Sequence, residues 1–437
     1  MAQAGSVAVP GDRAGAASGW VSGSTRWANP WTLAAAIFAL SRVVAFGGGL
    51  WGAKQLAETN PALSAGGVAD MALKWNGGLY TLIAINGYAW DPTYNAPITT
   101  AFFPLYSFLV AALSAVLRWL TPGFDWGNAY HGSYVAAGLI ISAVCFYFIL
   151  VLLMKLLAPR VGLAGAALAA VGLAVLPTSY YLTGLYTESL FLVLVLLAFV
   201  VAHSRLPAKW LCVGLVGMLA ALTRSAGVLL LAAMLVDYLA QRGWQWRKIR
   251  PDVLFLGLIP AGTAVYMAFL WWRFGDPLLV SKIQSMPPWN RHYGYFWDAY
   301  LNGWRILWIS STTGFPPGQD PILNDGQGSR LWYVLDLALP AVMLVGAWVA
   351  RKKVLASEWV WLVLNIIFPL STGSTQSMSR FSLMLWPGLI WLGGVGGWEK
   401  WGTVGRWGRW LVVPLLLLSL ALMAWLSAKF SMGKWVA

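Results

Sequence analysis

Residues 134–154 read YVAAGLIISAVCFYFILVLLM and contain no charged side chain. About 20 consecutive apolar residues are needed for a helix to cross the hydrocarbon core of a bilayer. Segments of this kind follow one another along the chain, and this pattern predicts an all-helical, polytopic membrane protein. We place eleven spans at about 31–53, 130–155, 161–180, 186–203, 209–223, 225–241, 252–273, 330–350, 355–370, 381–397 and 410–428.

The composition excludes a soluble globular protein. Of 437 residues, 59% are hydrophobic and only 10% are charged, whereas about 25% of the residues in soluble domains are charged. Cys145 and Cys212 lie within apolar runs and the three histidines are scattered, so we predict no disulfide framework, no metal and no cofactor. The net charge of +14 is typical of basic cytoplasmic loops and does not indicate a nucleic-acid partner.

The basic residues predict the orientation in the membrane. They cluster in every second loop, and all clusters become cytoplasmic when the N-terminal tail is inside. This arrangement requires an odd number of spans, so the apolar stretch 101–120, with a helix starting near Pro104, is expected to be re-entrant or interfacial on the outer side. Residues 1–30 and 429–437 are expected to be tails, the first a loose cytoplasmic one. They flank a single transmembrane domain, 31–428, with outer loops at 54–129 and 274–329. The basic clusters are Lys155/Arg160, Arg205/Lys209, Arg242 to Arg250, Arg351/Lys352/Lys353 and Lys400/Arg406/Arg409.

Most of the unusual polar residues lie in the outer loops, so we expect the chemistry to face outward. Asp70, Asn76 and Asp91 lie in the first outer loop, between two membrane segments. Glu188 opens an apolar span, where a carboxylate either interacts favourably with the helix dipole or serves a function. These four residues are the candidate catalytic residues.

Arginines and aromatic residues of the outer side form a second set of candidates. Arg224 and Arg380 lie at outer helix ends, where each either extends to lipid headgroups or binds phosphate, whose oxygens match the guanidinium fork. Asp276 precedes Pro277, a pattern that indicates a turn before it indicates catalysis. The candidate substrate-binding residues are Trp75, Tyr80, Tyr181, Arg224, Asp276, Arg291 and Arg380.

Several short motifs resemble those of the PIG-V family of mannosyltransferases, which are integral-membrane glycosyltransferases with the GT-C fold. Eukaryotic members of that family add the second mannose during GPI-anchor assembly. The motifs occur in the family order and suggest a prokaryotic member, located in the plasma (inner) membrane. They are KWNGGLY and AINGY within 74–88, AFFPLY at 101–106, LPTSYY and YTESLF within 176–191, LTRSAG at 222–227, GDP at 275–277 and SRF at 379–381.

The resemblance implies a polyprenyl-phosphate sugar donor, normally carrying mannose, a glycolipid or glycan acceptor, and inverting transfer on the extracytoplasmic side. It also implies that a carboxylate in the first outer loop acts as general base. This chain has Asn76 where the family usually has Asp, and an amide cannot accept the proton. Three explanations stay open: an Asp-to-Asn change that preserves binding but removes activity, a substitute base at Asp70, Asp91 or Glu188, and a non-catalytic relative.

Two other functions are alternatives. A non-catalytic lipid-phosphate or glycolipid binding or transport protein would use the same outer cavity without transfer. A secondary transporter would need polar residues at the middle of the membrane in both halves, whereas the charged residues here gather on one side and no internal repeat is visible. The sequence therefore favours a glycosyltransferase scaffold in which Asn76 replaces the usual base.

Overall fold

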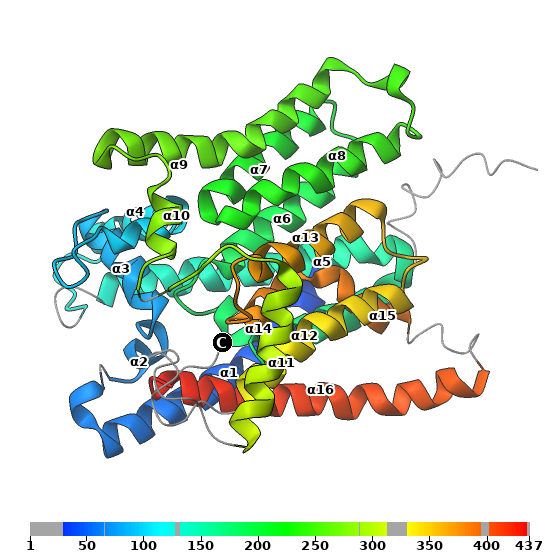
Figure 1. Cartoon of the computed structure of the whole chain (residues 1–437). Coiled ribbons are helices and arrows are strands. Elements are labelled where there is room, and N and C mark those ends of the chain that lie inside the picture. The colour runs from blue at the N-terminus through cyan, green and yellow to red at the C-terminus, as the bar shows by residue number, and fades with distance from the viewer. Residues whose placement is uncertain are drawn as a thin grey trace, which may run out of the picture.

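The computed structural model describes residues 29–64, 66–126, 132–287, 289–312, 330–394 and 402–434. Within these ranges the protein is all-helical, apart from one isolated β-bridge between Asp91 and Ala96 (Figure 1). The first helix, α1 (Pro30–Thr59), begins where the Asn29 side chain accepts hydrogen bonds from the backbone of residues 31 and 32. Proline suits the first helical position because its missing N–H would have no partner there.

Five helical segments of the described chain are long and apolar enough to cross a membrane, which makes this a multi-pass membrane protein. The last of them continues to Ser431, past the predicted start of the C-terminal tail at residue 429. The predicted N-terminal tail lies outside the described residues up to residue 28. The five segments are α1, α5 (Gly132–Ala174), η6 (Pro251–Gly257) with α9 (Leu258–Phe274), α12 (Arg330–Val349) and α16 (Gly402–Ser431).

The prediction of eleven spans is therefore wrong by the criterion of helix length. The predicted spans 130–155 and 161–180 form one element, α5, which is kinked at Gly162 with a φ of 75°. The predicted span 381–397 is broken into short turns between α14 (Met378–Phe381) and α15 (Ile390–Gly393).

The other apolar helices have 10–17 residues. A helix of 15 residues extends only about 22 Å, which is less than the ~30 Å hydrocarbon core. Hydropathy overestimates the number of spans because a helix buried inside the protein is as apolar as one that faces lipid. These shorter helices are α4 (Pro104–Leu120), α6 (Glu188–Ala202), α7 (Lys209–Thr223), η4 (Ser225–Leu229) with α8 (Leu230–Gln241), and α13 (Ala356–Leu370).

The helix α6 lies in the middle of the molecule, between α5 and α7, and most of its side chains are buried. Figure 1 shows α1 and α16 side by side along one edge, with α7, α8 and α9 on the opposite side. α4 begins at Pro104, as predicted, and packs on α5 and on α3 (Asn76–Asn86). Its re-entrant or interfacial location stays a prediction.

A buried arginine holds the break between α5 and α6. Arg42 of α1 is 3% exposed and donates hydrogen bonds to the backbone oxygens of Ala174 and Ser179, both at 2.8 Å. The carbonyl groups at a helix end have no partner within the helix, and here Arg42 supplies one. It thereby fixes the non-helical segment that includes η3 (Ser179–Leu182) and leads to Glu188.

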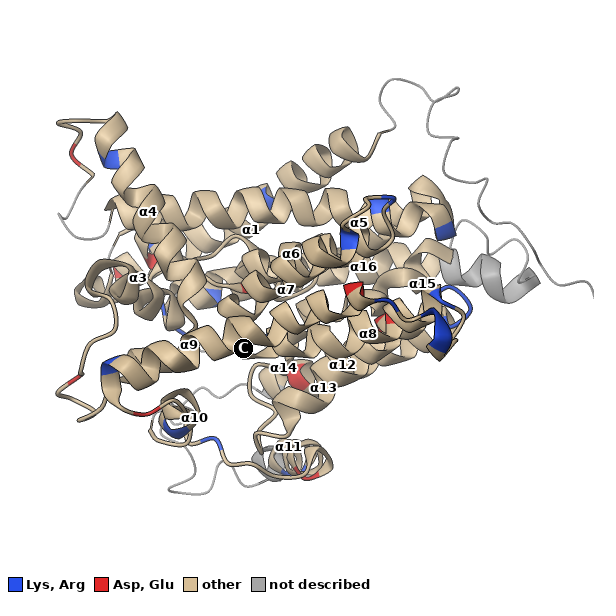
Figure 2. Ribbon diagram, turned by 90° about the horizontal axis from the view of Figure 1, so that it is seen from above, with Lys and Arg blue, Asp and Glu red and all other residues tan. Residues whose placement is uncertain are grey.

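The two ends of the helix bundle differ in charge. Figure 2 shows several Lys and Arg residues gathered at the end where α5, α8 and α15 are labelled. Contacts between helix ends join the elements there: Arg160 of α5 pairs with Glu358 of α13, and Lys209 of α7 donates to Gln241 of α8. Basic loops that are far apart in the sequence thus lie on one side of the molecule.

Candidate functional site

Three arginines converge on a cavity of about 230 Å³, which we call the arginine pocket. Arg224 directly follows α7, Arg291 follows α10 (Leu279–Gln284) and Arg380 lies in α14. Asn76, at the start of α3, lines the same cavity. Elements from both halves of the chain therefore build the site. Aromatic side chains form much of its wall: Tyr80, Phe102, Phe103, Phe191, Trp289 and Phe368.

Arg224 is held in one orientation at the end of α7. Its backbone is extended, with φ of −153° and ψ of 149°, directly before η4. Its Nη1 donates to Glu188 Oε1 at 2.6 Å and to Thr187 Oγ1 at 3.0 Å, and only 17% of the side chain is exposed. Because one edge of the guanidinium is fixed in this way, its remaining N–H groups are available to a ligand in the pocket.

Arg380 is placed by a buried aspartate of α12. Asp336 accepts hydrogen bonds from the backbone N–H groups of Ser377, at 3.2 Å, and Ser379, at 2.8 Å. Ser377 has a φ of 69°, which is uncommon for a residue other than glycine. The aspartate thus stabilises the strained turn that carries Arg380. The guanidinium lies over the ring of Tyr181, 5.3 Å from its centroid.

Glu188 joins two of the arginines. It is 1% exposed, and its Oε1 lies 2.6 Å from Arg224 Nη1 and 3.2 Å from Arg380 Nε. Two cations already neutralise this carboxylate, so it is poorly placed to serve as a general base. Three arginines and one carboxylate leave a formal excess of two positive charges, which favours an anionic ligand.

Arg291 brings the third cation from the segment between α10 and α11 (Phe296–Thr312). Its backbone N–H donates to the backbone oxygen of Gln284 at 2.9 Å, and its Nη1 lies 3.4 Å from Gln284 Oε1. Burial, together with the nearby charges of Arg380 and Arg224, lowers the pKa of Arg291 to about 10. Repulsion among the three guanidinium groups would be relieved by an anion between them.

Aromatic rings enclose the pocket on one side. The buried Tyr80 meets Phe102 edge to face with 5.0 Å between ring centroids, and Trp289 meets Phe102 at 5.7 Å. Such a wall suits the apolar face of a sugar ring or of an isoprenoid. Tyr181 stacks on Arg380 but is not among the residues that line the pocket. Its contact with the pocket is therefore indirect.

Asn76 is the amide that lines the pocket from the start of α3. It follows Trp75, whose φ of 54° and ψ of −126° are sparsely populated for a residue with a side chain. Trp75 is 38% exposed and lies outside the lining. Within the described part of the chain, no Asp, Glu, His or Cys lines the pocket, and no group of three such residues is arranged to hold a metal ion.

The three candidate aspartates lie outside the arginine pocket, and each has a partner close by in the sequence. Asp70 is buried and pairs with Lys74 at 2.9 Å. Asp91 accepts a hydrogen bond from the backbone of residue 93 at 2.8 Å within its own turn. Asp276 forms the predicted turn, and hydrogen bonds from Lys282 and from the backbone of residue 278 lower its pKa. The structure thus does not bring these carboxylates together.

Several polar residues of the site were not predicted from the sequence, among them Asn365 and Asp336. Asn365 of α13 lines the pocket, and Asp336 of α12 holds the turn that carries Arg380. Both lie within predicted spans, 355–370 and 330–350. The available signal was their polarity, because a polar side chain within an apolar segment indicates a functional or structural partner by default.

Comparison with known proteins supports the fold and no narrower family. No protein-family model matches the chain, and no curated protein matches it. The chain is similar to ArnT from Cupriavidus metallidurans bound to undecaprenyl phosphate, with a TM-score of 0.50 and 13% identity over 92% of this chain and 76% of ArnT. For the apo oligosaccharyltransferase of Archaeoglobus fulgidus, the TM-score is 0.46 and the identity 13%, over 92% of this chain and 56% of that one. The similarity to ArnT shows that this all-helical membrane protein has a GT-C-like fold.

Proposed function

We propose that this protein is a glycosyltransferase scaffold that binds a polyprenyl-phosphate sugar donor in the arginine pocket and transfers the sugar, a hexose such as mannose, to a glycolipid or glycan hydroxyl. The observation that carries this proposal is the convergence of Arg224, Arg291 and Arg380 on one pocket with an aromatic wall. ArnT, which shares the fold, was crystallised with undecaprenyl phosphate. We place the reaction on the extracytoplasmic side of a prokaryotic plasma membrane, opposite the basic loops.

The proposed reaction has two requirements: the departing phosphate must be stabilised, and a base must accept the proton of the acceptor hydroxyl. The acceptor oxygen attacks the anomeric carbon, the bond from that carbon to the lipid phosphate breaks, and the phosphate leaves with the electron pair. The three arginines stabilise its charge through fork-shaped hydrogen bonds. The acceptor proton needs a base. Among the described residues that line the pocket, Asn76 stands at the position where the PIG-V family usually has the basic aspartate. We therefore expect the donor to bind fully, and the sugar to be transferred much more slowly than with an aspartate at position 76.

A non-catalytic lipid-phosphate or glycolipid carrier on the same scaffold is the second candidate. It is favoured by the lack of any carboxylate among the described lining residues. Both candidates require lipid-phosphate binding, and they differ only in the chemistry that follows.

A transfer assay distinguishes the enzyme from the non-catalytic carrier. It measures transfer of labelled mannose from polyprenyl-phosphate mannose by the detergent-solubilised parent protein and by its Asn76→Asp variant. General-base catalysis contributes about 10²- to 10⁴-fold, so Asn76→Asp should increase the rate by at least about 100-fold. Asn365→Asp is the matched control, because it adds a carboxylate elsewhere in the pocket and should not restore transfer. If lipid phosphate binds but neither Asn76→Asp nor the parent transfers any sugar, the enzyme proposal is wrong and the non-catalytic carrier is the function that the result supports.

A further inference from the structure

A second basic hollow lies at the opposite end of α7 from the arginine pocket. α7 begins at Lys209, which lines this hollow, and ends at Thr223, which lines the arginine pocket. A helix of 15 residues separates the two by about 22 Å. The hollow has a volume of about 660 Å³, and we call it the basic loop pocket. Its cationic lining residues are Lys209, Arg242, Arg247, Lys248 and Arg250.

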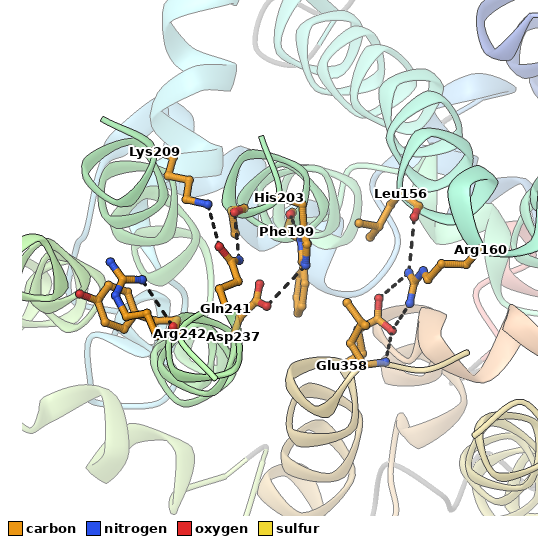
Figure 3. A network of polar contacts seen from close by, with 12 residues as sticks. Leu156, Arg160, Phe199, His203, Lys209, Asp237, Gln241, Arg242 and Glu358 are labelled. Carbon is orange, nitrogen blue, oxygen red and sulfur yellow. Dashed lines mark hydrogen bonds and ion pairs between the residues drawn. The ribbon is translucent and has the colours of Figure 1, made fainter. Parts of the chain in front are cut away.

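A fixed polar network supports the base of this pocket (Figure 3). Lys209 donates to Gln241 Oε1 at 2.7 Å, and the amide of Gln241 donates to the backbone oxygen at the end of α6 at 3.1 Å. Arg242 lies over the ring of Tyr238, 3.4 Å from its centroid, and pairs with Asp252 at 3.1 Å. These contacts join α6, α7 and α8 and fix Arg242 at the start of the loop between α8 and α9.

Three of the cations have no partner within the described part of the protein. Arg247, Lys248 and Arg250 are exposed, and their side chains make no hydrogen bond or ion pair to described residues. Asp252 is the single carboxylate among the described lining residues, and Arg242 already pairs with it. The predicted orientation explains positive charge on this side of the membrane, but it does not require the charges to surround one hollow.

The surroundings of the pocket suit a lipid better than a free ion. Trp244 and Trp246, in the same loop, are 56% and 75% exposed, and tryptophan prefers the level of the lipid headgroups. Leu206 and Ile249 line the pocket and are partly exposed, which adds apolar surface beside the charges. We propose that the basic loop pocket binds the phosphate headgroup of an anionic glycerophospholipid, a site separate from the arginine pocket and independent of its proposed function.

Lipid retention by the full chain in detergent tests this proposal, with phosphatidylglycerol and phosphatidylcholine as probes and native mass spectrometry as the readout. The test variant is Arg247→Gln/Lys248→Gln/Arg250→Gln. Near an anionic lipid each such charge contributes about fivefold to binding, so the triple variant should bind phosphatidylglycerol at least about tenfold more weakly. Each single variant should lose about two- to fivefold, which keeps the test decisive if the triple variant does not fold.

The matched control is Arg351→Gln/Lys352→Gln/Lys353→Gln. It removes three exposed cations from another basic loop near Arg160, outside the pocket, and should change phosphatidylglycerol binding less than twofold. Equal losses in both triple variants, or equal retention of phosphatidylcholine by the parent, would overturn the proposal. Full displacement of phosphatidylglycerol by about 20 mM inorganic phosphate would also overturn it, because the site would then recognise the free ion.

Discussion

Replacement of Arg224 by glutamine should weaken lipid-phosphate binding strongly. The guanidinium lines the arginine pocket and is oriented by Glu188 at 2.6 Å. A hydrogen bond to a charged group contributes about 1.5–3 kcal/mol, and each 1.4 kcal/mol corresponds to a factor of ten. The dissociation constant for undecaprenyl phosphate should therefore rise by about 10- to 150-fold.

The same substitution also affects stability, and the two effects can be separated. Glu188 is 1% exposed, and removal of one partner from a buried ion pair costs about 3–5 kcal/mol. Arg380 still lies 3.2 Å from the carboxylate, so we expect the lower end of that range. The double variant Arg224→Gln/Glu188→Gln removes the carboxylate that has lost one of its two partners and keeps the formal charge of the pocket. It should recover only part of the thermal stability, because Arg380 then loses its carboxylate, and it should not recover lipid-phosphate affinity.

Binding is measured with undecaprenyl phosphate on the purified protein in detergent, and uncharged undecaprenol serves as the reference ligand. This assay does not depend on catalytic competence, which Asn76 puts in question. Arg273→Gln is the matched control, because Arg273 is an exposed arginine at the end of α9 that does not line the pocket. An affinity of Arg224→Gln within twofold of the parent would refute phosphate binding by this residue. If the double variant recovers affinity, the net charge of the pocket determines lipid-phosphate binding, and the direct contact with Arg224 does not.

Three further substitutions test the framework of the site. Asp336→Asn removes the charge that holds the turn before Arg380, so undecaprenyl-phosphate affinity should fall about 3- to 10-fold; unchanged affinity would contradict this positioning role. Arg42→Met removes the guanidinium donor from two buried carbonyl groups, of which Ala174 keeps a hydrogen bond from Ser179 Oγ; the cost of about 1–3 kcal/mol for one unsatisfied group should lower the thermal midpoint in differential scanning fluorimetry. Asp276→Asn should alter undecaprenyl-phosphate affinity less than twofold, and less than Glu188→Gln does. A larger effect of Asp276→Asn in binding titrations would contradict the greater importance of Glu188 for binding.

Local patterns were sufficient for the starts of two helices near the site. Pro104 begins α4, as predicted. Glu188 begins α6, as its place before an apolar run predicts. These features depend on residues within a few positions of one another, so they can be predicted without knowledge of the packing.

Hydropathy alone determined that this is a helical membrane protein, and the charge pattern separated basic loops from loops that carry the polar candidates. Only the tertiary structure decided which candidates meet: Arg224, Arg291, Arg380 and Asn76 line one pocket, while Asp70 is paired within its own loop. The physical reason is that transfer into lipid depends on the composition of each segment by itself. An ion pair depends on the positions of two side chains that may be hundreds of residues apart, and packing alone determines those positions.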